Sequence, residues 1–189
     1  VFWIAEQAAR DLSKDAYPYK MYRFVKDLYE MGVPWEEARD AIYQRYQVEQ
    51  QDGYDITSRN LPCNGCFAAG INFAAGFVSL FYGEGDFKET LKIGALSGWD
   101  SDNPTATWGG FLGFLYGKDG IEGAFGQSFA SKFNIHRTRR NFPNDGMDTL
   151  GNMARKGVLI VDRVVQERLG GGVDLDEGVW YVPQSPEGE

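Results

Sequence analysis

Two carboxylates and an amide lie within four residues in the segment Asp-Ser-Asp-Asn, directly before an apolar, glycine-rich run. The side-chain oxygens of Asp100, Asp102 and Asn103 are ligands that Mg²⁺, Mn²⁺ and Ca²⁺ prefer. Two carboxylates near apolar side chains such as Trp108 repel each other and lose hydration, unless a cation lies between them. The segment therefore predicts a site for a hard divalent cation, and the alternative is a solvated acidic turn beside a helix N-terminus.

The segment does not fit an EF-hand loop. Such a loop needs Gly at its sixth position and Glu at its twelfth, and counting from Asp100 these positions hold Thr105 and Phe111. Asn103 followed by Pro104 also predicts a helix start, in which the Asn side chain accepts from exposed backbone amides. With the EF-hand excluded, the remaining interpretation is a catalytic site of the Mg²⁺ type that takes further ligands from outside this segment.

Helices must position this turn, because apolar residues recur at close to 3.6-residue spacing along most of the chain. Gly32 is expected to end one helix, and Asp86 is expected to cap another. Gly109, Gly113 and Gly117 recur every four residues and predict a groove for close backbone packing. The expected helices cover residues 2–12, 17–31, 34–46, 66–82, 86–97, 104–116 and 148–169, with Asp148 as the cap of the last.

The predicted fold class is all-α. The run of residues 66–82 is apolar almost all round, which is typical of a central helix. The residues after 170 read as a mostly irregular tail with one short strand at 179–182. No internal repeat and no domain boundary is visible before that tail, so residues 1–170 are expected to belong to one helical domain.

Charge and composition exclude two classes of partner. The chain of 189 residues carries a formal net charge of −8, so it lacks the basic surface that nucleic acid requires. No apolar run reaches the length of about 18 residues that spans a membrane. The first residue is Val and no signal peptide precedes it, so a processed or trimmed chain is expected. The compartment stays open between the cytoplasm and secretion.

Cys63 and Cys66 are the only cysteines. Two thiols cannot make a four-thiolate zinc site, and no His lies nearby to complete a mixed one. Two packed structural thiols are the preferred interpretation, a disulfide across the short loop comes second, and redox catalysis third.

The segment SGWDSDNPTATWGGFLGFLYG, residues 97–117, resembles the C-terminal metal motif of the ADP-ribosylglycohydrolase family. The family pattern runs Gly-Gly-Asp-Thr-Asp-Thr, followed by a helix of small and apolar residues that ends Gly-Ala-Tyr-Gly. The preceding segments GEGDFKETLKIGALS and CFAAGINFAAGFVSLFYG resemble the two family helices before the motif. The likeness covers most of residues 1–170 and is weak outside the motif.

This resemblance implies a compact orthogonal multi-helix bundle that holds two Mg²⁺ ions, or Mn²⁺, at the bottom of a cleft. Asp100 and Asp102 would be metal ligands, with Asp102 a candidate bridge between the ions. Asn103 occupies the position of a ligand Thr, and its amide oxygen can still coordinate. Trp99 replaces a glycine beside the metals, so it would narrow the cleft or offer a ring to a substrate sugar, although a plain core role for Trp99 is the alternative.

The family's remaining ligands form a Thr-Asp-Asp cluster in an N-terminal half, and this chain contains no such triplet. The chain is therefore expected to supply the C-terminal half of the fold. A second polypeptide would supply the other half of the metal site and the catalytic acid or base. It could be cut from the same precursor. The catalytic residues themselves are not identified.

The resemblance implies a Mg²⁺-dependent hydrolase that cleaves the glycosidic bond to ADP-ribose in a small molecule or an ADP-ribosylated substrate. Two alternatives stay open at this point. One is a catalytically inactive binding or structural protein on the same scaffold, since some relatives serve as lens crystallins and fold does not fix function. The other is a hydrolase of a different glycoside, which the aromatic Trp99 favours.

Overall fold

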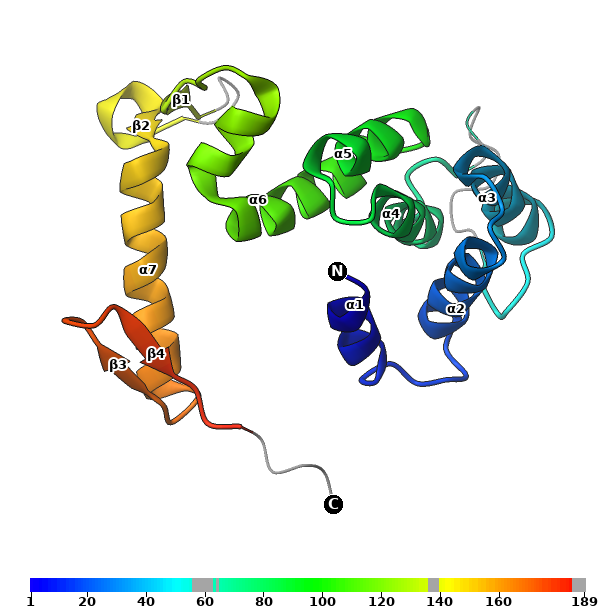
Figure 1. Cartoon of the computed structure of the whole chain (residues 1–189), viewed down its shortest axis with the longest axis horizontal. Coiled ribbons are helices and arrows are strands. Elements are labelled where there is room, and N and C mark those ends of the chain that lie inside the picture. Colours follow the sequence, from blue (N-terminus) through cyan, green and yellow to red (C-terminus); the bar gives the residue numbers. More distant parts are fainter. Residues whose placement is uncertain (56–62, 64, 136–139, 185–189) are drawn as a thin grey trace. The chain divides into compact units, whose positions relative to one another are not determined.

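The computed structural model describes residues 1–55, 63, 65–135 and 140–184. The chain divides into two compact units, Val1–Gln127 and Ser128–Glu189 (Figure 1). Both units are helical apart from two small sheets, which confirms the predicted all-α class. None of the helices in these ranges combines the length and the apolar character that crossing a bilayer requires. The expectation of one helical domain over residues 1–170 stays a prediction.

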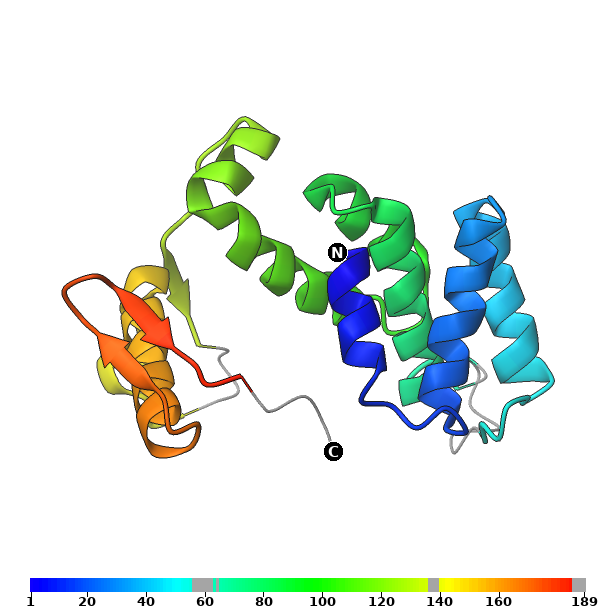
Figure 2. The same cartoon turned by 60° about the horizontal axis from the view of Figure 1, so that its bottom comes forward.

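The first unit is built around one central helix. Figures 1 and 2 show the helix α4 among the others, and it packs against α2, α3, α5 and α6. This confirms that the apolar run forms a central helix, although α4 begins at Ala69 rather than at Cys66. The elements of this unit are α1 (Phe2–Ala9), α2 (Tyr17–Glu30), α3 (Trp35–Ile42), the π-helical turn η1 (Tyr43–Val48), α4 (Ala69–Gly83), α5 (Phe87–Leu96) and α6 (Asp102–Phe125).

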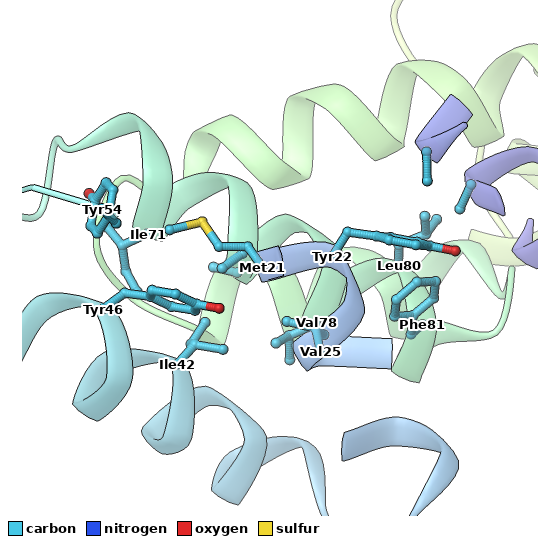
Figure 3. Packing of buried hydrophobic residues seen from close by; sticks show 14 of the residues in the cluster. Met21, Tyr22, Val25, Ile42, Tyr46, Tyr54, Ile71, Val78, Leu80 and Phe81 are labelled. Atoms are coloured by element: carbon cyan, nitrogen blue, oxygen red, sulfur yellow. The ribbon is translucent and has the colours of Figure 1, made fainter. Parts of the chain in front are cut away.

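The core of this unit lies where α2, α3 and η1 meet α4 (Figure 3). Aromatic rings pack edge to face across it, such as Tyr22 on Phe77 with ring centroids 5.3 Å apart. Residues three or four positions apart on each helix supply this face, which is why the sequence spacing predicted it. The fully buried members include Met21, Val25, Ile42, Tyr46, Ile71, Val78 and Phe81.

Two of the predicted helix ends are confirmed. Gly32 follows α2 with a φ of 72°, a left-handed conformation that glycine adopts without steric cost. Asp86 caps α5, because its carboxylate accepts the backbone N–H of Glu89 at 2.7 Å. Local sequence was therefore sufficient at both places.

The predicted capping by Asn103 is wrong. Ser101 already has near-helical dihedral angles, so α6 begins at Asp102 and Asn103 lies inside its first turn. The amide Nδ2 of Asn103 donates to Asp100 Oδ2 at 2.9 Å instead of the side chain accepting from a backbone amide. Pro104 is still tolerated there, because the first four N–H groups of a helix have no intrahelical partner.

The predicted glycine groove along α6 is also only partly present. Gly117 has a φ of 66° and a ψ of 173°, so it interrupts the helix rather than extending the stripe. At Gly109 an added Cβ would lie 3.3 Å from the side chain of Leu91 on α5, so this position does permit close packing. The break at Gly117 confirms that the first helical segment ends at Tyr116.

The second unit holds α7 (Leu150–Glu167) and two antiparallel pairs. The pairs are β1 (Lys132–Asn134) with β2 (Met147–Thr149), and β3 (Gly172–Asp174) with β4 (Val179–Tyr181). The turn η2 (Pro143–Gly146) precedes β2. Of the four strands named here, the sequence predicted β4 and not the other three. The predicted cap Asp148 is wrong by one position, since Thr149 Oγ1 accepts the N–H of Asn152 at 3.0 Å.

Cys63 and Cys66 form a disulfide. The preferred interpretation of two packed thiols is therefore wrong, and the second interpretation is confirmed. The bridge closes a turn just before α4, and Gly65 at its centre has a φ of 77°. A chemical bond between residues three apart leaves little trace in composition, which is why spacing alone did not decide it.

A partly buried ion pair lies beside η1. Asp52 Oδ2 accepts from Arg45 Nε at 2.9 Å and from the hydroxyl of Tyr46 at 3.1 Å. Burial raises the pKa of Asp52, but the hydrogen bonds from Arg45 and Tyr46 and the charges of Arg45 and Lys20 outweigh it. The pKa of Asp52 is therefore lowered from its ordinary value.

Asp52→Asn is expected to lower the free energy of unfolding by about 1 to 2 kcal/mol at pH 7. Because the folded pKa is lowered, the contribution of Asp52 is present above its unfolded pKa of about 3.9 and is lost as the pH falls through the folded pKa. Urea unfolding at a series of pH values from 7 down into the acid range measures this. The control Asp11→Asn removes an exposed carboxylate, and an Asp52→Asn effect that does not shrink as the pH falls would contradict the prediction.

Candidate metal and substrate site

A pocket of about 460 Å³ opens between α4 and the start of α6. Its polar side chains come from the acidic turn, from the first turn of α4 and from Thr107 on α6. Its walls are largely aromatic, and no basic side chain is among the described residues that line it. The lining residues are Phe67, Ala69, Asn72, Phe73, Gly76, Phe77, Asp100, Asn103, Pro104, Thr107 and Trp108.

The acidic turn has an unusual backbone. Gly98 and Trp99 follow each other with φ values of 91° and 55°. A left-handed conformation costs a residue with a bulky side chain about 1 to 2 kcal/mol, so surrounding contacts must hold Trp99 in place. The indole of Trp99 stacks on Tyr43 of η1, with ring centroids 6.2 Å apart and planes 19° apart.

Asn72 connects the acidic turn to the start of α4. Its Oδ1 accepts the backbone N–H of Asp100 at 3.1 Å. Its Nδ2 donates to the backbone carbonyls of Cys66 at 2.8 Å and Ala68 at 3.0 Å. The side chain of Asn72 therefore uses both its acceptor and its donor group on backbone atoms around the pocket.

Trp108 fixes the other wall. Its indole Nε1 donates to the carbonyl of Gly76 at 2.7 Å, and its ring meets Phe77 edge to face with centroids 6.2 Å apart. An added Cβ at Gly76 would lie 3.5 Å from Trp108 Nε1, which is an ordinary van der Waals contact, so this approach does not depend on the glycine. The first turns of α6 are thus attached to α4, and the acidic turn lies at a defined position over the pocket.

The structure brings two of the four predicted site residues into this pocket. Asp100 and Asn103 line it, and the hydrogen bond between their side chains joins them. Asp102 lies beside them with an exposed side chain that makes no hydrogen bond or ion pair to any residue in the described ranges. Trp99 is directed to Tyr43 and is not among the lining residues, so its role towards a substrate stays a prediction.

The donor set of the turn fits a hard divalent cation. Asp100 supplies carboxylate oxygens, Asn103 can supply its amide oxygen, and none of the described residues that line the pocket is a cation that could neutralise Asp100. A cation held by both residues needs the Asn103 amide turned over, so that its oxygen rather than Nδ2 faces Asp100. Within the described ranges, no three His, Cys, Asp or Glu side chains converge in a metal-binding group, so Asp100, Asp102 and Asn103 would need further ligands to hold a cation.

Sequence reasoning missed Asn72 and, apart from Trp108, the aromatic wall. One signal for Asn72 was present, because it is one of few polar residues in the apolar run of residues 66–82. A polar side chain inside a buried helix needs a partner, which pointed to a contact outside the helix. The same logic applies to Ser79, whose hydroxyl donates to the Thr90 carbonyl at 2.6 Å.

Comparison with known proteins agrees with the motif. The ADP-ribosylglycohydrolase family model matches residues 1–143, about three quarters of the chain. No curated protein sequence and no solved structure matches the chain. The matched residues include the acidic turn, the pocket and every helix of the first unit. The chain belongs to the ADP-ribosylglycohydrolase family.

Proposed function

We propose that this chain is part of a Mg²⁺-dependent hydrolase that cleaves the glycosidic bond to ADP-ribose. Family membership supports glycohydrolase activity of this type. The observation that carries the proposal is that Asp100 and Asn103 line one pocket with aromatic walls. The pocket is of a size and character that suits a small-molecule group, with a few polar side chains against apolar surface.

Charge supports the metal dependence. ADP-ribose carries a pyrophosphate, and Asp100 would repel an anionic substrate in a pocket whose described lining residues include no basic side chain. Asp100, Asp102 and Asn103 would hold the cation. When bound, the cation supplies positive charge that orients the ribose hydroxyl groups and makes a nearby water more acidic.

The residues of the chain itself supply binding and orientation. The walls Phe73, Phe77 and Trp108 exclude water from one side of the pocket and offer rings on which a flat group can stack. Asn72 holds the backbone of the acidic turn. Holding a substrate in a defined orientation is worth several kcal/mol of the reaction barrier.

A second polypeptide segment is proposed to complete the site. The all-oxygen set of Asp100, Asp102 and Asn103 leaves most positions of a six-coordinate Mg²⁺ ion to water or to other ligands. Glycoside hydrolysis also needs a group that transfers a proton, which none of these residues is assigned. Residues outside this chain, from a second polypeptide or from the same precursor, would provide both.

The test uses the native protein, purified together with any polypeptide that stays bound to it. A protein labelled with radioactive ADP-ribose is the substrate, and the release of ADP-ribose is measured with Mg²⁺ and with the metal removed by a chelator. The proposal expects release that depends on Mg²⁺ and recovers when the metal is restored. Release that is unchanged by the chelator contradicts the metal dependence, and Mg²⁺ binding without any release supports a binding protein instead.

A further inference from the structure

We infer that Asn72 is a positioning residue for the acidic turn: its side chain attaches the backbone of Asp100 to the first turn of α4, so that Asp100 and Asn103 face the pocket. Its orienting role towards a cation rests on the function proposed above, but the attachment itself does not. Asn72 lies 28 residues before Asp100 in the sequence, so this link is tertiary and not part of the local motif.

The hydrogen bonds of Asn72 leave it little freedom. Two backbone carbonyls, of Cys66 and Ala68, accept from the same Nδ2, at 2.8 and 3.0 Å. This fixes the amide plane and directs Oδ1 at the N–H of Asp100 at 3.1 Å. A side chain of similar length but without an amide cannot make these three bonds at once, because the role needs one acceptor and two donor hydrogens.

The turn needs such an attachment. Trp99 has a left-handed backbone and is held on its side-chain face by Tyr43. Asp100 follows it directly, and the Asn72 bond is the contact that fixes its backbone N–H. Without this bond, two contacts remain to hold Asp100 and Asn103 over the pocket. The backbone N–H of Asn103 donates to the carbonyl of Asp100, and the Asn103 side chain donates to the Asp100 carboxylate. Metal ligands that are poorly oriented bind about 10- to 100-fold less tightly.

The first measurement needs no metal and no activity. The exchange of the Asp100 backbone amide with solvent is followed by nuclear magnetic resonance in the wild-type chain, in Asn72→Ala and in Asn72→Leu. Loss of one hydrogen bond is expected to speed this exchange by about 5- to 10-fold in both variants. An Asp100 amide that already exchanges freely in the wild-type chain overturns the inference without any variant.

The matched control is Ser79→Ala, which also removes a side-chain bond from α4 to the backbone of a neighbouring segment but lies at α5. Thermal unfolding of all variants is recorded as well. A change in exchange that comes from lower global stability can then be told apart from a change at Asp100 itself. Equal exchange of the Asp100 amide in Ser79→Ala and the Asn72 variants would mean that Asn72 only stabilises the fold, and this result overturns the inference.

The second measurement is the Mg²⁺ concentration that gives half-maximal ADP-ribose release by the native protein. Compared with the wild type, this Mg²⁺ concentration is expected to be about 10-fold higher or more in the Asn72 variants and unchanged in Ser79→Ala. If the wild type shows no Mg²⁺ dependence, the proposed function fails while the amide exchange still decides the attachment. If the wild type depends on Mg²⁺ and the Asn72 variants require no more of it, the positioning role fails.

Discussion

Asp100→Asn is expected to reduce Mg²⁺-dependent release of ADP-ribose by about 100-fold or more, because loss of an outer partner alone typically costs 10- to 100-fold in metal affinity or activity. The substitution removes one negative charge but keeps an oxygen that accepts from Asn103 Nδ2. The free energy of unfolding should therefore change by no more than about 0.5 kcal/mol. ADP-ribose release and urea unfolding, measured on the same preparation, separate the two effects.

Asp119→Asn is the matched control for this prediction. Asp119 has an exposed carboxylate at the start of the helical segment that follows Gly117, so it shares the helix-dipole environment of Asp102 without lying at the pocket.

Asp102→Asn should lose activity as Asp100→Asn does, since the sequence predicts both as ligands. Full activity of Asp102→Asn would remove Asp102 from the ligand set, and full activity of Asp100→Asn would refute the site.

Gly83→Ala is expected to lower the free energy of unfolding by about 2 to 3 kcal/mol. Gly83 ends α4 where this helix meets α5, and an added Cβ would lie 2.6 Å from the Cα of Thr90. Backbone atoms cannot move aside as a flexible side chain can, so the two helices would have to separate. The midpoint and slope of urea unfolding measure the loss.

The same substitution at Gly110 should have the opposite sign. Gly110 lies inside α6 with open space around it, so an added methyl group only reduces the freedom of the unfolded chain. Gly110→Ala should therefore raise the free energy of unfolding by about 0.5 to 1 kcal/mol. A stabilising Gly83→Ala would show that α4 and α5 do not approach as closely as the structure has them.

The features that the sequence predicted are those that depend on neighbouring residues. The cap at Asp86 needs only its own carboxylate and an amide three residues later. The central helix needs only an apolar run, which has to be covered on all sides. The acidic turn at Asp100 was found because its residue types and order carry a chemistry of their own.

The features that the sequence did not predict depend on the backbone conformation that the chain adopts or on distant contacts. The sequence predicts that Asn103 caps the helix. In the structure Ser101 already has near-helical dihedral angles, so the helix starts earlier. Gly117 belongs to a regular glycine spacing, and only its φ of 66° shows that it interrupts α6. The bond from Asn72 to Asp100 spans 28 residues, and no local rule relates the two positions.

The backbone of the acidic turn also determines how the motif can be transferred. Trp99 keeps its left-handed φ of 55° while its ring lies on Tyr43, and both Tyr43 and Asn72 come from earlier parts of the chain. A graft of residues 97–117 onto an unrelated helical scaffold would carry the ligands but neither of these supports. The relaxed turn would then adopt ordinary right-handed or extended conformations, so the portable unit is the motif together with η1 and the first turn of α4.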